Sequence, residues 1–200
     1  RTAGSYARRG PVREPYDRVL IVCEGKKTEP YYFGGLRLHY RLSSANIEIT
    51  PANGTDPMSI VSFAEARLSE YDRVFCVFDR DGHQNYNAAV GRVSQSAEGH
   101  AGTLVAITSW PCFEFWLLLH FGCSAAPFHR AGKKSSGARA MEKLAAHVPG
   151  YNKGFKNIYE LLAPMTRDAI QNAIRLQREN TRTRSTNPST RLNEIVQYLI

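Results

Sequence analysis

The hydrophobic positions of the chain fall into short apolar runs separated by longer amphipathic stretches. Four runs, either mainly apolar or alternating between apolar and polar residues, have the length of buried strands. They cover residues 18–23, 46–50, 73–78 and 103–108. Between and after them, apolar residues recur at three- and four-residue spacing, which predicts helices. These helices are expected over residues 28–42, 57–71, 86–97 and 111–121.

Strands that alternate with helices of this length predict βαβ units. Right-handed crossovers then place the strands in a central parallel four-stranded sheet flanked by helices, which is an α/β fold. Local signals support two of the helix starts. Asp56 is the expected cap before Pro57, and Thr28 is the expected cap of the first helix.

The pattern changes after Gly122. Residues 123–137 are rich in Ser, Ala, Gly and Lys, which predicts a loop. Helical patterns follow at residues 138–146, 157–162, 167–179 and 190–200. We therefore expect a basic flexible tail over residues 1–17, an α/β domain carrying the functional site over residues 18–122, and a helical extension. The extension, residues 123–200, is expected to pack on or cap the same domain.

Composition narrows the class of protein. Hydrophobic residues make up 42% of the chain, which is enough for a core. No apolar run reaches the length of a membrane span, and residues 1–17 lack the apolar segment of a signal peptide. The four cysteines form no C-x-x-C pair, which favours a reducing compartment. We expect a cytoplasmic protein without a membrane partner.

The formal net charge is +8, which favours a polyanionic partner. Acidic residues nevertheless gather at the predicted strand ends. Glu24 follows the first strand, Asp79 and Asp81 follow the third, and Glu114 lies in the first turn of the helix after the fourth. In an open parallel sheet, ligands bind beyond the carboxyl ends of the strands, so these acids are expected to share one site.

The spacing of the two aspartates fits metal chemistry. In an extended segment Asp79 and Asp81 point to the same side, while Arg80 points away. Carboxylates and water are the ligands that Mg²⁺ or Mn²⁺ prefers, and two such ions activate a water and stabilise the leaving oxygen of a phosphodiester. Each acid taken alone also fits a helix cap or a turn residue.

The residues around these acids resemble a known family. Glu24–Gly25 and Asp79–Arg80–Asp81 are similar to the Toprim domain of topoisomerases, primases and OLD-family nucleases. More narrowly, residues 18–200 resemble the RloB family, whose members are linked to bacterial abortive-infection and restriction loci, often beside an ATPase. The strings that carry this resemblance are IVCEGKKTEPYYF, VFDRDGH, PCFEFWLLLHF, YNKGFKNIY and NPST.

The resemblance implies a Toprim-like (Rossmann-like) fold and a Mg²⁺- or Mn²⁺-dependent endonuclease. Its substrate would be RNA, with tRNA among the candidates, or DNA, and its setting bacterial anti-phage defence by abortive infection. An AAA/ABC-type ATPase is the implied protein partner, and self-association into a homo-oligomer stays open. Glu24, Asp79 and Asp81 match the Toprim acids, and Glu114 matches the later acid that completes the metal site. Glu29 matches the second acid of OLD-like nucleases, one residue further along.

Four basic residues near these acids are candidates for nucleic-acid contact. Lys26 and Lys27 either contact substrate phosphate or are solvated. His83 fits a proton shuttle, a phosphate contact or an ordinary loop histidine. Lys153 fits a residue that neutralises charge in the transition state, or a surface lysine. Trp110 fits the core or a stacking contact with a base.

Two other functions remain open at this point. One is a non-catalytic module that binds nucleic acid or an ATPase partner and uses the acids for a structural metal. The other is a receiver-like phosphoacceptor, since an aspartate after the third strand also fits that fold. The second is weaker, because receivers carry paired acids after the first strand, whereas Glu24 is followed by Gly25 and two lysines.

Overall fold

The computed structural model describes residues 17–80, 82–99 and 103–200, and its centre is a sheet of five strands in the order β2-β1-β3-β4-β5. The strands are β1 (Val19–Cys23), β2 (Ile47–Pro51), β3 (Arg73–Asp79), β4 (Leu104–Trp110) and β5 (Ser189–Thr190). The first four are parallel, as the sequence predicts. The prediction of a purely parallel four-stranded sheet is wrong, because β5 pairs antiparallel to β4 at its edge. Asp81 and residues 1–16 of the predicted tail lie outside the described residues.

Strand β5 is too short to show a hydrophobic pattern in the sequence. It pairs Thr190 with Ser109 and Ser189 with Trp110, and the hydroxyl oxygens of Ser109 and Thr190 lie 2.9 Å apart. This pairing extends β4 to Trp110, beyond the predicted end at residue 108. The following helix consequently begins at Phe113 rather than at residue 111.

The predicted helices are present, with shifted ends. They are α1 (Thr28–His39), α2 (Pro57–Glu65), α3 (Tyr86–Gly99), α4 (Phe113–Leu118), α5 (Ser136–His147), α6 (Ile158–Leu162), α7 (Thr166–Thr183) and α8 (Leu192–Leu199), with short 3₁₀ turns at η1 (Leu68–Glu70) and η2 (Ala163–Met165). Asp56 caps α2 as predicted, accepting from the Met58 and Ser59 amides at 3.1 and 3.2 Å. The predicted Thr28 cap is wrong: its hydroxyl instead donates to the Lys153 carbonyl oxygen at 3.2 Å.

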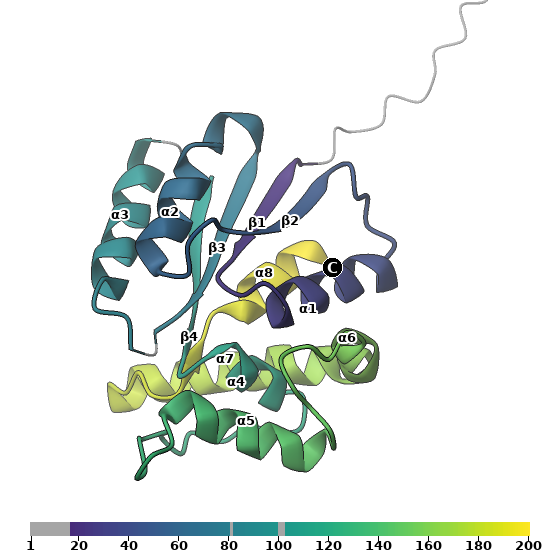
Figure 1. Ribbon diagram of the computed structural model, residues 1–200, viewed down its shortest axis with the longest axis vertical. Coiled ribbons are helices and arrows are strands. Elements are labelled where there is room, and N and C mark those ends of the chain that lie inside the picture. The colour runs from purple at the N-terminus through teal and green to yellow at the C-terminus, as the bar shows by residue number, and fades with distance from the viewer. Residues whose placement is uncertain (1–16, 81, 100–102) are drawn as a thin grey trace, which may run out of the picture.

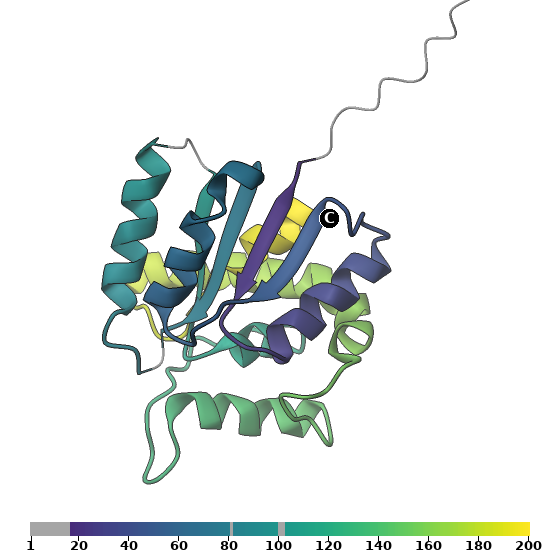
Figure 2. The ribbon, with the colours of Figure 1, turned by 45° about the horizontal axis from the view of Figure 1, so that its top comes forward.

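Alternate residues of the parallel strands supply two hydrophobic cores on opposite faces of the sheet. In β1, Val19, Ile21 and Cys23 belong to the larger core, and Leu20 and Val22 belong to the smaller one. Helices α2 and α3 cover the smaller core, while α1 and α8 lie against the other face of the sheet (Figures 1 and 2). The sheet is thus buried on both sides, which explains why its strands read as continuous apolar runs.

The C-terminal helices share the larger core with the sheet. They contribute buried side chains that include Leu144, Tyr159, Leu176 and Ile195. Figure 1 shows α4, α5, α6 and α7 gathered beyond the carboxyl ends of the parallel strands, while α8 returns to the sheet. This arrangement places the second part of the chain next to the predicted site. Among the described residues, no helix has the length and apolar character needed to cross a membrane.

A buried histidine belongs to this larger aromatic core. His120 is 3% exposed, and its Nδ1 lies 3.2 Å from the carbonyl oxygens of both Trp116 and Leu117. Within the described part of the chain, its Nε2, the Tyr32 hydroxyl and the Trp116 Nε1 are buried without a hydrogen-bond partner. Burial lowers the pKa of His120 from 6.5 to about 4, while the two carbonyl oxygens oppose the shift. The imidazole is therefore neutral in the folded protein at neutral pH.

This burial predicts acid sensitivity of the fold. Because the folded pKa lies below that of the unfolded chain, His120 contributes stability above pH 6.5 that is lost as the pH falls toward 4. Across this window the free energy of unfolding should fall by about 3 kcal/mol on account of this residue. Urea unfolding of wild type and His120→Leu across the window measures it, with the exposed His129→Gln as control. If the free energy of unfolding of His120→Leu fell as much as that of wild type on acidification, His120 would not be the cause of the acid sensitivity.

Candidate functional site

A cavity of about 320 Å³ lies at the carboxyl ends of β1 and β3. Its walls come from the β1–α1 loop, the start of α1, the segment before α2, the start of α4 and the loop between α5 and α6. The lining residues are Glu24, Gly25, Lys26, Lys27, Thr28, Glu29, Thr55, Asp79, Phe113, Glu114 and Lys153. Four of the five predicted acids therefore meet in one cavity, and the fifth, Asp81, lies outside the described residues.

Glu24 links the ends of the two central strands. Its own amide donates to the Val77 carbonyl oxygen at 3.0 Å, which continues the β1–β3 ladder past β1. Its carboxylate Oε2 accepts from the Asp79 amide at 2.8 Å. Its Oε1 lies 3.0 Å from the His83 Nε2. This pair of contacts fixes the Glu24 carboxylate over the strand ends, and the parallel pairing of β1 with β3 makes it possible.

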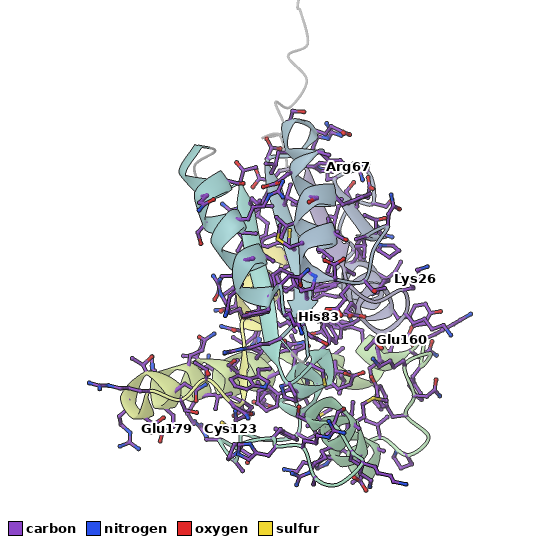
Figure 3. All side chains as sticks on the ribbon, turned by 60° about the vertical axis from the view of Figure 1, so that its left-hand side comes forward. Lys26, Arg67, His83, Cys123, Glu160 and Glu179 are labelled. Carbon is purple, nitrogen blue, oxygen red and sulfur yellow. The ribbon has the colours of Figure 1, made fainter. Side chains whose placement is uncertain are left out.

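His83 contacts the site through Glu24 without lining the cavity. Lys26 and Lys27 line the cavity rim and are exposed, as expected for residues that meet solvent or a ligand from outside. Figure 3 shows Lys26 and His83 at the level where the sheet meets the helices below it. Their predicted roles in nucleic-acid contact stay predictions.

Glu29 is the most deeply placed acid of the first loop. It is 7% exposed, and its Oε1 accepts from the Gly25 amide at 3.2 Å. Burial raises the pKa of Glu29 to about 7, its backbone hydrogen bonds oppose this, and the charges of Glu114 and Glu24 add to it. The one-residue displacement from the OLD-like pattern does not turn this side chain away, because the first turn of α1 directs it back over the loop.

Asp79 ends β3 inside the cavity. Burial raises the pKa of its carboxyl well above the ordinary value, and repulsion from Glu24, Glu29 and Glu114 raises it further. The Phe113 amide opposes the rise. Among the residues that the structure describes, no basic side chain forms an ion pair with Asp79, Glu29 or Glu114. These three acids therefore have no direct ion pair, while Lys26, Lys27 and Lys153 line the same cavity at longer range.

Glu114 reaches the cavity from the first turn of α4. It is 2% exposed, and its Oε1 accepts from the Tyr151 hydroxyl at 3.2 Å. Burial, followed by the charge of Glu114, raises the pKa of Tyr151, so the phenol stays protonated and donates. The same loop supplies Lys153. Burial alone would lower the pKa of Lys153, but Glu114, Glu29 and Asp79 raise it above the ordinary value.

The arrangement is not a finished cation site. Across residues 17–80, 82–99 and 103–200, no group of three or more His, Cys, Asp or Glu side chains is already arranged to hold a metal ion. The donor chemistry still fits a hard divalent cation, because four carboxylates share one cavity and carboxylate oxygen is the ligand that Mg²⁺ and Mn²⁺ prefer. Two of these acids, Glu29 and Asp79, have a pKa that burial and the neighbouring acids raise. A bound ion needs these carboxylates to move closer together, or a further ligand from the chain.

Three residues of the site were not singled out from the sequence. Thr55 follows β2, so the strand-end rule that found the acids could have included it. Thr28 lines the cavity after being read as a helix cap. Tyr151 is the first residue of the YNKG string, but nothing local indicates that its hydroxyl meets a glutamate 37 positions earlier.

Gly25 leaves room for the Glu29 carboxylate, so a single added methyl group should disturb the site. A Cβ at this position would lie 2.2 Å from the Glu29 Oε2, so Gly25→Ala must displace the carboxylate. Because the displaced atoms are the end of a flexible side chain, the cost comes from the lost hydrogen bond between the Gly25 amide and the Glu29 Oε1, and we expect a loss of about 1 kcal/mol in stability. The matched control is Gly34→Ala in α1, where a Cβ meets nothing within 4 Å and alanine should stabilise the helix. Thermal unfolding of both variants measures the difference, and equal behaviour would contradict the prediction.

The fold and the gathered acids define an α/β protein with an acidic cavity at the carboxyl edge of its parallel strands. This chain belongs to the RloB family, since the family model described as RloB-like protein matches residues 19–199. The match covers nearly the whole described chain, including both the strand ends that carry the acids and the loop that carries Lys153. A search of the curated proteins finds no match.

Proposed function

We propose that this RloB-family chain is a Toprim-type nuclease that hydrolyses phosphodiester bonds of RNA or DNA with Mg²⁺ or Mn²⁺, in bacterial anti-phage defence. The observation that supports it most is the meeting of Glu24, Glu29, Asp79 and Glu114 in one cavity, where the pKa of Glu29 and of Asp79 is raised. Such a cavity is costly to fold, and a divalent cation between carboxylates and phosphate removes the cost. The net charge of +8 elsewhere suits a polyanionic substrate.

Glu24, Asp79, Glu29 and Glu114 would hold the ion, and Asp81, which follows Asp79 by two positions, would complete the set. When bound, the divalent ion supplies the positive charge that activates a water and stabilises the leaving oxygen. The chain contributes orientation: the Asp79 amide and His83 hold both oxygens of Glu24 in place.

Two basic groups of the chain have complementary tasks in this proposal. Lys153 keeps its proton because three acids face it, so its ammonium can offset charge that builds on the phosphate in the transition state. His83 is held by Glu24 through Nε2, which leaves Nδ1 for a proton transfer with substrate or solvent.

The proposal is tested by incubating the protein with labelled total RNA, plasmid DNA and single-stranded DNA. Each reaction contains Mg²⁺, Mn²⁺ or a chelator, and wild type is compared with Glu24→Gln. Cleavage that needs metal and is lost in Glu24→Gln supports the nuclease and names its substrate class. No cleavage by wild type, even with an added AAA/ABC-type ATPase of the kind that the family resemblance implies, overturns the proposal.

A second candidate is a non-catalytic module that binds nucleic acid or an ATPase partner. The observation that favours it is the net charge of +8, which suits binding of a polyanion whether or not the polyanion is cut. Titration calorimetry with Mn²⁺ separates the two: metal binding with no cleavage of any substrate favours the module.

A further inference from the structure

Arg80 leaves the carboxylate cavity and lies on aromatic rings. It follows Asp79 directly, does not line the cavity, and points away from the acids as the strand alternation predicts. Its guanidinium carbon is 4.1 Å from the centre of the Trp110 ring, at the end of β4, and 5.4 Å from the centre of the Tyr86 ring, at the start of α3. Two neighbouring elements of the sheet edge thus hold this side chain beside the site.

The guanidinium has few other partners. Its NH1 donates to the Thr186 hydroxyl at 3.2 Å, and no carboxylate in the described part of the chain pairs with it. By contrast, Arg67, Arg92 and Arg191 each form an ion pair with a glutamate. Arg80 is therefore oriented by rings rather than neutralised by an acid, and most of its N–H groups remain for a ligand.

The chemistry of such a group favours phosphate. A guanidinium stacked on aromatic rings loses little conformational freedom on binding, and its planar fork matches two oxygens of a phosphate. A further positive charge lies close by in the sequence: Arg184, the C-cap of α7 and two positions before Thr186, is exposed and has no acidic partner among the described residues. One face of the Trp110 ring is thus covered by Arg80.

We propose that Arg80, held by Trp110 and Tyr86, binds a backbone phosphate of the nucleic acid next to the one that enters the carboxylate cavity. This inference rests on the proposed function for its choice of ligand. Because Asp79 and Arg80 are consecutive and point to opposite sides of β3, neighbouring phosphates would be held on the two sides of the strand end. Such a contact fixes the position of the strand and carries no base specificity.

Fluorescence anisotropy with a labelled short single-stranded RNA, and separately a DNA, tests the contact in the presence of a chelator, so that cleavage is absent. Arg80→Ala is expected to weaken binding about ten-fold, as for loss of a charged hydrogen bond, and to lower the salt-dependence slope by about one. Arg80→Lys should keep the slope and lose part of the affinity, because the charge remains and the fork does not.

Arg73 provides a matched control at the other end of β3. Its guanidinium carbon lies 4.8 Å from the centre of the Tyr198 ring, so Arg73→Ala removes the same charge and the same kind of ring contact, far from the cavity. It should leave affinity and slope near those of wild type. Equal effects of Arg80→Ala and Arg73→Ala, or no effect of Arg80→Ala, overturn the inference.

The binding assay separates this inference from the proposed nuclease. If wild type binds nucleic acid through Arg80 but cleaves no substrate, the phosphate contact is supported and the nuclease proposal is rejected. If wild type cleaves nucleic acid, and Arg80→Ala binds and cleaves it equally well, the nuclease proposal is supported and the phosphate contact is rejected. A wild type that binds neither RNA nor DNA at low salt rejects both.

Discussion

Asp79→Asn is expected to lower metal-dependent cleavage about a thousand-fold while the metal-free protein becomes no less stable. The loss follows from removing a carboxylate ligand, which withdraws several kcal/mol of charge stabilisation from the transition state. The stability follows from the pKa of Asp79, which burial and the three neighbouring acids raise well above its ordinary value. Asparagine removes that repulsion and keeps the shape and the backbone amide that binds Glu24.

Single-turnover cleavage and thermal unfolding with a chelator measure the two effects. The matched control is Asp168→Asn, an exposed acid in the first turn of α7, which should change neither cleavage nor its metal dependence. Metal-dependent cleavage that survives in Asp79→Asn would remove this residue from the site. Loss of cleavage with a large loss of stability would instead indicate a structural role.

Glu29→Gln is expected to stabilise the metal-free protein above neutral pH. The pKa of Glu29 is about 7 in the folded chain against 4.5 ordinarily, so its contribution is most favourable below pH 4.5 and is lost as the pH rises through 7. Above that window the ionised carboxylate costs about 3 kcal/mol, which a neutral amide avoids. Glutamine keeps an oxygen that can accept from the Gly25 amide.

Urea unfolding on both sides of this window, with a chelator present, checks the sign. The free energy of unfolding of Glu29→Gln should be higher than that of wild type above pH 7 and equal to it below pH 4.5. Glu160→Gln, an exposed glutamate in α6, should show no pH-dependent gain. A variant that is less stable than wild type at high pH would mean that the Glu29 carboxylate is not under repulsion. With added Mn²⁺, wild type should become the more stable of the two proteins, because only wild type has the Glu29 carboxylate to bind the ion.

Much of the site follows from a simple rule about parallel strands. Glu24 directly follows β1 and Asp79 ends β3, and these two strands pair in parallel, so the meeting of the two acids requires only that the strands be adjacent. Glu114 follows because β4 pairs with β3 and α4 begins just beyond. Glu29 could be found only from the family resemblance, since its position depends on how the first turn of α1 folds back over Gly25.

Other features depend on contacts between distant segments. Two polar residues at Ser189–Thr190 carry no strand pattern, yet they extend β4 and delay α4 because they find a partner 81 positions away in Ser109. Thr28 is a good cap by type, but the loop that carries Lys153 offers its hydroxyl a carbonyl oxygen instead. In each case a long-range partner prevails over a local preference.

The loop between α5 and α6 also has a consequence for how the protein is made. The four acids of the cavity are all translated by residue 114, whereas Tyr151, Lys153 and the last core helix follow later. A chain still emerging from the ribosome therefore carries the acids without the lysine that faces them, and without the side chains of α8 that close the larger core. The cavity therefore gains its full lining only after residue 153 has been made, so shorter nascent chains lack it.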